Sequence, residues 1–265
     1  MCRWLDIPRS SYYYKAVEPV SEAELEKMIK RIFLDNKSRY GARKIKKCLE
    51  SEGITLSRRR IRRIMQKLHL VSVYQKAAFK PYFKGKNEAP LPNLLNRQFN
   101  QEKPLEALVT DLTYVRVGNR WAYVGLIIDL FNREIIGLSV GWYKTADLVK
   151  EAIQSIPYAL NKVKMFHSDR GKEFDNQLID EILEVFGITR SLSQPGCPYD
   201  NAVAESTYHA FKVEFINQEA FQSLEELPLK TKDYVHWWNH HRIHGSLNYS
   251  HLVLKQYSKH CFKTK

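Results

Sequence analysis

The sequence predicts an α/β protein: a mixed five-stranded sheet with flanking helices, preceded by a small all-α basic domain. The formal charge of +13 belongs entirely to residues 1–100, which carry a net +14, whereas residues 101–265 carry a net −1. The basic part shows three short helical patterns, and the neutral part shows strand patterns followed by helical ones. A chain of 265 residues can hold both a small domain and a full core.

Residues 1–72 are predicted to form a basic helical domain of the helix-turn-helix kind. A capping box at 21–24 starts the first helix, 42–52 forms the second with Gly53 as its stop, and Ser57 caps the third. The outer face of the third helix carries five arginines: Arg58, Arg59, Arg60, Arg62 and Arg63. This face is predicted to contact DNA phosphates, with an ordinary three-helix bundle as the alternative.

Residues 73–104 contain four prolines and no sustained period, so they are predicted to be a linker. Three strands at 107–117, 121–130 and 133–142 follow, and their short turns favour an antiparallel meander. The later elements are expected to be a helix over 145–160, a strand ending at Asp169, a helix over 177–186, a strand over 189–192, a helix after Tyr199 and a helix over 223–240. This order is that of a ribonuclease H-like core over 105–250, with 251–265 as a tail. In that core the first and fourth strands are neighbours.

Three carboxylates carry the chemical prediction. Asp111 lies within an apolar strand, Asp169 ends another, and Glu205 follows on a helix after 35 intervening residues. A carboxylate in an apolar strand is costly unless it is paired or bound to a metal. The three side chains are therefore predicted to hold two Mg²⁺ or Mn²⁺ ions for phosphodiester chemistry. Asp129 lies in a similar strand and is expected to be structural or supporting.

Other residues are predicted around this site from periodicity. Helical spacing places Asn201, His209 and Lys212 on the face of Glu205, and strand alternation places His167 on the face of Asp169. Lys212 and Asn201 are predicted to contact DNA, and His167 and His209 to support the ligands. For His167 simple packing is the alternative. Arg242 is predicted to contact DNA or, alternatively, to buttress the catalytic helix.

Several segments resemble DDE transposases and integrases, most closely the second-frame (OrfB) transposases of the insertion-sequence-three family. They are Thr-Asp-Leu-Thr-Tyr at 110–114, His-Ser-Asp-Arg-Gly at 167–171, Gly-Cys-Pro-Tyr-Asp-Asn-Ala at 196–202, Tyr-Gly-Ala-Arg-Lys-Ile at 40–45 and Trp-Asn-His-His-Arg-Ile-His at 238–244. The chain departs from that pattern at Leu108, where Trp is usual, and at Ser250-His251, where Ser/Thr-Pro is usual. The resemblance implies a retroviral-integrase-like core, with Asp111, Asp169 and Glu205 as the metal ligands.

The expected function is that of a bacterial insertion-sequence transposase, a Mg²⁺-dependent enzyme that cleaves DNA at element ends and joins it to a target. The expected partners are terminal-repeat and target DNA, further copies of the chain, and an upstream OrfA product or fusion. Two alternatives are an inactive DNA-binding regulator and a metal-dependent nuclease that does not join strands. Four scattered cysteines and no long apolar run favour a soluble protein of the bacterial cytoplasm, associated with the nucleoid and not with a membrane.

Overall fold

The computed structural model describes residues 21–74, 92–247 and 250–251, which divide into two compact units, one ending at Val73 and one starting at Tyr74. The predicted linker over 73–104 and tail over 251–265 lie partly outside the described residues. Their boundaries therefore stay predictions.

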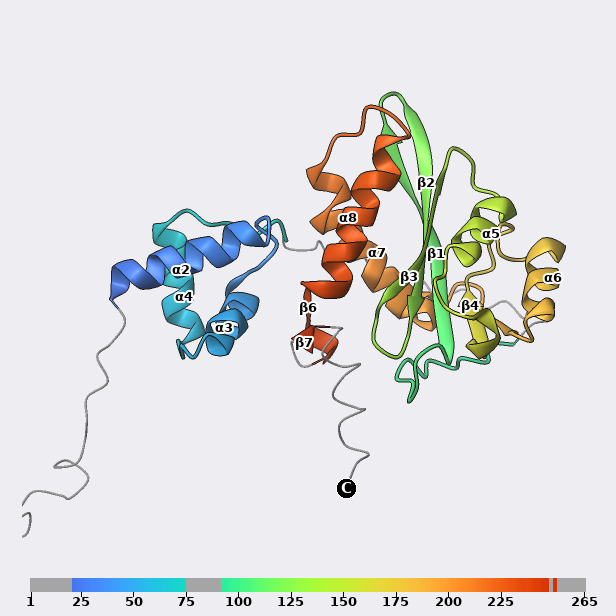
Figure 1. Ribbon diagram of the computed structural model, residues 1–265, viewed down its shortest axis with the longest axis horizontal. Helices are drawn as coiled ribbons and strands as arrows, with labels where there is room; N and C mark the ends of the chain where they lie inside the picture. Colours follow the sequence, from blue (N-terminus) through green and yellow to red (C-terminus); the bar gives the residue numbers. More distant parts are fainter. Residues whose placement is uncertain (1–20, 75–91, 248–249, 252–265) are drawn as a thin grey trace, which may run out of the picture. The chain divides into compact units, whose positions relative to one another are not determined.

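The described part of the first unit contains three helices, α2 (Glu22–Asp35), α3 (Ala42–Ser51) and α4 (Arg58–Lys67) (Figure 1). Ser21 and Glu24 cap α2 reciprocally, and the Ser57 side chain accepts a hydrogen bond from the Arg60 backbone N–H at the start of α4. One buried apolar stripe from each helix forms the small core, which includes Leu25, Ile29, Ile45, Leu49, Ile61 and Ile64. The three predicted helices are confirmed.

The second unit is built on a five-stranded sheet of order β3-β2-β1-β4-β5. The strands are β1 (Ala107–Val117), β2 (Arg120–Asp129), β3 (Ile135–Gly141), β4 (Met165–Ser168) and β5 (Thr189–Leu192). The first three form the predicted antiparallel meander, whereas β4 runs parallel to both β1 and β5. The sheet is therefore mixed, and the first and fourth strands are neighbours, as predicted.

The pairing of β1 with β4 decides where the two aspartates lie. Val109 is opposite His167, and this is the last pair of the ladder. Asp111 and Asp169 each follow two residues later along parallel strands. Because strand side chains alternate and the two strands are parallel and in register, both carboxylates lie side by side on one face, beyond the last pair of this ladder.

Helices cover both faces of the sheet (Figure 1). On one face α5 (Ala146–Gln154) and α6 (Gln177–Val185) pack over residues such as Ile127 and Phe166. On the other face α7 (Ala202–Glu214) and α8 (Glu226–His240) pack over residues such as Val115 and Val124. This layered order is a ribonuclease H-like fold.

One predicted boundary is wrong. The helix expected over 145–160 ends at Gln154, and Leu160–Lys162 forms a separate 3₁₀ turn. Pro157 explains the difference, because proline has no backbone N–H for a helical hydrogen bond and disfavours helical backbone in the residue before it. The remaining short elements are the 3₁₀ turns Pro198–Asn201, Ile216–Gln218 and Gly245–Leu247 and the strand pair β6 (Ile243–His244) and β7 (Ser250–His251).

Candidate active site

A pocket of about 410 Å³ brings Asp111, Asp169 and Glu205 together. Asp111 lies within β1, two residues beyond its last pair with β4, Asp169 directly follows β4, and Glu205 comes from the first turn of α7. The rest of the wall is made by the segments after β4 and β5 and by the residue before α7: Arg170, Gly171, Ser193, Gln194, Pro195, Gly196, Cys197 and Asn201. The structure thus assembles the three carboxylates that the sequence selects.

Two hydrogen-bonded anchors hold α7 against β1, one on each side of Glu205. One turn before it, Asn201 Nδ2 donates to the Thr110 carbonyl at 3.1 Å. One turn after it, the Tyr208 hydroxyl donates to the Asp111 carbonyl and accepts from the Leu126 N–H at 2.5 Å. The position of α7, which carries Glu205, is therefore fixed against β1 on both sides of that residue.

The electrostatics of the pocket favour a bound cation. Burial, together with the smaller effects of the Asp169 and Glu205 charges, raises the pKa of Asp111 to about 7, against a hydrogen bond from the Leu112 N–H at 2.7 Å. Burial also raises the pKa of Asp169, although the Gly171 N–H donates to its Oδ1 at 2.9 Å. Burial raises the pKa of Glu205 as well. The carboxylates together carry more negative charge than their surroundings balance.

The donor set fits a hard divalent ion, since it consists of carboxylate oxygens. Within the described residues, however, no three Asp, Glu, His or Cys side chains are close enough to form a finished metal cluster. Asp111, Asp169 and Glu205 are therefore candidates for ligands that draw together around an ion.

A fourth carboxylate and one lysine, both missed by the sequence reasoning, lie beside the aspartates. Lys144 Nζ is 2.6 Å from Glu173 Oε1, and Glu173 is buried. The positive charge of Lys144 opposes the rise in the pKa of both Asp111 and Asp169. The position of Glu173, four residues after Asp169, was the only available signal, because Lys144 lies in a distant turn of the sequence.

Asp200 organises the loop that closes the pocket, and the sequence reasoning missed this role too. Its Oδ1 accepts from Arg97 Nε at 2.7 Å and its Oδ2 from the Gln194 N–H at 3.1 Å. Burial opposes ionisation of Asp200, but these hydrogen bonds lower its pKa below the ordinary value. The Arg170 Nε also donates to the Ser193 carbonyl at 2.9 Å, which ties the two pocket loops together.

The two histidines predicted to support the ligands lie in different surroundings. His167 is fully buried, with Nδ1 2.8 Å from Ser191 Oγ and Nε2 3.1 Å from Ser193 Oγ, and burial lowers its pKa to about 4. It is therefore a neutral, packed residue, and one of its partners, Ser193, lines the carboxylate pocket. His209 is exposed and lines a different depression, together with Arg242. The predicted support of the ligands by His209 has no counterpart in the carboxylate pocket.

Two residues predicted to contact DNA are largely buried. Arg242 is only 8% exposed, and its guanidinium pairs with the buried Glu214 of α7, with Nη2 2.9 Å from Oε1. This pairing agrees with the alternative prediction, in which Arg242 buttresses the helix that carries Glu205. Asn201 is 4% exposed and uses its amide nitrogen to hold β1, so it has little surface left for DNA.

Lys212 and Asp129 lie outside the pocket. Lys212, half-buried on α7, places Nζ 4.4 Å from the centre of the Tyr114 ring. Asp129 is 2% exposed and accepts hydrogen bonds from the backbone N–H groups of Leu105 and Phe131. Asp129 therefore stabilises the turn between β2 and β3.

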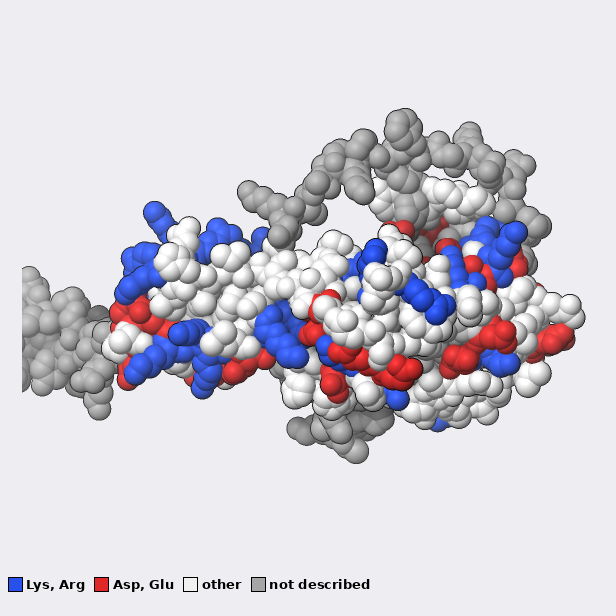
Figure 2. Space-filling model, turned by 90° about the horizontal axis from the view of Figure 1, so that it is seen from above, with Lys and Arg blue, Asp and Glu red and all other residues white. Residues whose placement is uncertain are grey.

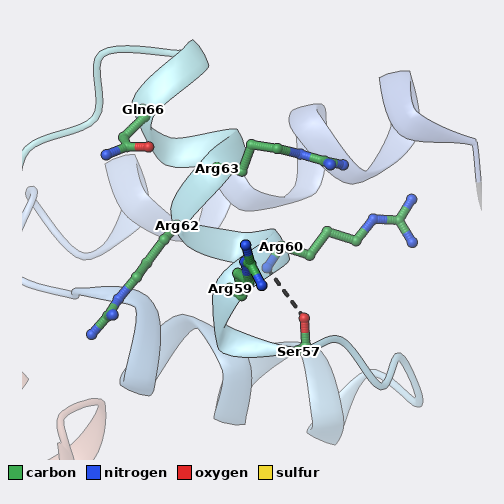
Figure 3. A pocket seen from close by; sticks show the side chains of 6 residues that line it. All are labelled: Ser57, Arg59, Arg60, Arg62, Arg63 and Gln66. Carbon is green, nitrogen blue, oxygen red and sulfur yellow. Dashed lines mark hydrogen bonds between the residues drawn. The ribbon is translucent and has the colours of Figure 1, made fainter.

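The arginine face of α4 forms a shallow depression in the first unit, lined by Ser57, Arg59, Arg60, Arg62, Arg63 and Gln66 (Figure 3). Glu22 of α2 pairs with Arg60 at 2.7 Å and with Arg63 at 3.4 Å. Arg59 and Arg62 have no ion pair within the described part of the chain. In the view of Figure 2, lysines and arginines are prominent over the first unit, where some acidic residues are also visible, and both signs of charge are mixed over the second unit.

Comparisons with known proteins agree with this arrangement. A model described as an HTH-like domain matches residues 19–78, and two models described as integrase core domains match residues 101–198 and 186–251. The chain belongs to the insertion-sequence transposases that carry an integrase core domain.

Two relatives show how far the similarity extends. The chain is 32% identical over 248 residues to the InsK protein of insertion sequence element IS150 from Escherichia coli (strain K12), covering 92% of this chain and 87% of that one. It is 30% identical over 241 residues to the transposase for insertion sequence element IS904 from Lactococcus lactis subsp. lactis (strain IL1403), covering 88% and 93%. Among solved structures, the catalytic core domain of BIV integrase is similar over 59% of this chain and 99% of that one, at 17% identity and a TM-score of 0.43.

Proposed function

We propose that this transposase is a metal-dependent polynucleotidyl transferase that cuts DNA at the ends of its element and joins those ends to a target. The observation that carries the proposal is the convergence of Asp111, Asp169 and Glu205 in one pocket with raised pKa values. Buried carboxyl groups whose charges oppose one another favour a cation between them.

Asp111, Asp169 and Glu205 would hold two Mg²⁺ or Mn²⁺ ions, which lower the pKa of the attacking hydroxyl and stabilise the leaving oxygen. In the first step water attacks a phosphodiester, and the broken P–O bond leaves a 3′-hydroxyl. In the second step that 3′-hydroxyl attacks a phosphodiester of the target and displaces another 3′-oxygen. The anchors at Asn201 and Tyr208 would keep the part of α7 that carries Glu205 in place through both displacements.

The proposed partners are DNA and further copies of the chain. The arginine face of α4 binds phosphates of duplex DNA. Further copies of the chain bring the two element ends together. None of the helices in the described residues has both the length and the hydropathy needed to cross a bilayer. We place the reaction in the bacterial cytoplasm, where the chromosome is.

The test uses the variants Asp111→Asn, Asp169→Asn and Glu205→Gln with an oligonucleotide duplex that carries the element end. Each variant keeps the side-chain shape and loses one charge, so cleavage and joining in Mg²⁺ should fall to background while duplex binding stays unchanged. The matched controls are Asp233→Asn and Glu184→Gln, which alter exposed carboxylates on α8 and α6 and should leave activity intact.

The same assay separates the alternatives. A wild-type protein that binds the ends and never cuts them would be a regulator. A wild-type protein that cuts them and yields no joined product would be a nuclease. Full activity in any one of the three variants would remove that residue from the metal site.

A further inference from the structure

Two large aromatic side chains are exposed side by side on the hairpin of β1 and β2. Tyr114 is 56% exposed and Trp121 is 49% exposed. Their ring centres are 5.2 Å apart, and the rings meet edge to face at 88°. Neighbouring exposed rings of this size commonly mark a binding surface, because water solvates them poorly.

The strand register makes this pair part of one surface. Tyr114 is opposite Tyr123, and Arg116 is opposite Trp121, so these four side chains share one face of the hairpin. The other face holds Val115 and is buried in the core. Because β4 pairs with β1 only as far as Val109, no strand of the described residues covers the edge of β1 beside Tyr114.

Two cations flank the rings. Lys212 Nζ from α7 lies 4.4 Å from the Tyr114 ring centre, and Arg116 Cζ lies 5.6 Å from that of Trp121. These contacts orient the positive charges around the aromatic pair, while about half of each ring side chain remains open to solvent. A surface of aromatic rings with adjacent lysine and arginine has the chemistry of a single-stranded nucleic acid site.

The position relative to the carboxylates fits the same ligand. Tyr114 follows Asp111 by three residues on β1, about 10 Å at the usual strand rise, and the two side chains point to opposite faces of that strand. Lys212 follows Glu205 by seven residues on α7, also about 10 Å at the helical rise. Both routes lead from the pocket to the patch over a distance equal to about three nucleotides of a duplex.

We propose that Tyr114 and Trp121 form a stacking platform for unpaired bases of the DNA strand next to the reacting phosphodiester, with Lys212 and Arg116 holding its phosphates. This inference rests on the proposed function and adds a substrate feature to it, a frayed strand end. Bases inside a duplex are already stacked on one another, so only unpaired bases can use the exposed ring faces.

The test measures binding by the full-length chain, without Mg²⁺, of a short mixed-sequence single strand and of the blunt duplex of the same sequence. Tyr114→Ala and Trp121→Ala should each weaken single-strand binding by roughly 5- to 150-fold, the range of one lost base stack. Both should change duplex binding far less. Tyr114→Phe keeps the ring and should bind as the wild type does, and Phe186→Ala, an exposed aromatic residue on the C-cap of α6, is the control.

A second readout keeps this result separate from catalysis. A 2-aminopurine placed within three nucleotides of the cleaved bond should be quenched by the wild type and by Asp111→Asn, and not by Tyr114→Ala. If the wild type quenches 2-aminopurine fluorescence but shows no cleavage activity, the proposed function is wrong and the stacking platform is supported. Unchanged single-strand affinity and unchanged quenching in both Ala variants would overturn the platform. So would a loss of self-association in sedimentation at unchanged affinity, because the patch would then bind a second copy.

Discussion

At the residue scale, the active site depends on side chains that do no chemistry. Tyr208 is 5% exposed, and its hydroxyl links the backbone of Asp111 to that of Leu126. A phenol in this position couples the catalytic helix to two strands at the level of the first carboxylate. Loss of one oxygen atom should therefore affect both stability and geometry.

Tyr208→Phe is expected to lower the free energy of unfolding of the core by about 1–3 kcal/mol, because it leaves buried backbone groups without their partner. Cleavage should fall as well, since Glu205 loses one of its two anchors. Denaturant unfolding and end cleavage measure the two effects. Tyr158→Phe removes an exposed hydroxyl that lies 3.3 Å from Glu134 and should change neither. Unchanged stability and activity in Tyr208→Phe would show that this hydroxyl is dispensable.

The raised pKa of Asp111 predicts a pH dependence of stability. Burial moves this pKa from 3.8 to about 7, so the folded state binds the proton more tightly than the unfolded chain does. Protonated Asp111 therefore contributes to the free energy of unfolding at low pH, and this contribution is lost as the pH rises from about 3.8 to about 7. In metal-free buffer the wild type should therefore lose stability, relative to Asp111→Asn, between about pH 4 and pH 7. Denaturant unfolding of both proteins across the window measures the difference, and parallel curves would contradict it.

At the element scale, much of the fold could be predicted because it depends on local pattern. The periodicity of apolar residues predicted the positions of β1 and of the helices of the first unit. The order of the elements predicted that β1 and β4 are neighbours. The ion pair between Lys144 and Glu173 could not be predicted, since it joins a turn to a loop far along the chain. Arg97 and Asp200 are likewise 103 residues apart. Such contacts are set by the packed layers and have no local signal.

The α4 helix also has ion pairs that the local sequence pattern could not predict. The sequence placed five arginines on one face, and the structure divides them, because Glu22 pairs with Arg60 and Arg63. Removal of Arg59 and Arg62 together should reduce the slope of log affinity against log salt for duplex DNA by about 1.8, because each phosphate contact contributes about 0.9. Arg60→Ala with Arg63→Ala is the matched comparison and should reduce the slope less. Equal effects in a salt titration would show that the ion pairs with Glu22 open on binding.

At the scale of the whole molecule, most of the charge and the chemistry are carried by different units. Residues 1–73, the first unit, carry a net +10 of the total +13, and the three carboxylates belong to the integrase core. Long-range attraction to duplex DNA should therefore come from the first unit, while the core selects the strand that reacts. The order of the two units in the chain matches the two matched domain families.

Separate fragments of residues 1–74 and 92–265 test this division. The first fragment should bind duplex DNA of any sequence and reproduce most of the salt slope of the full chain, because released counterions drive its binding. The second should bind duplex weakly and prefer single strands, because its aromatic pair and not its net charge provides the contact. Each fragment's fold is first verified by its cooperative unfolding. A larger salt slope for duplex binding in the second fragment than in the first would show that the core holds the duplex itself, and the division of labour between the units would be wrong.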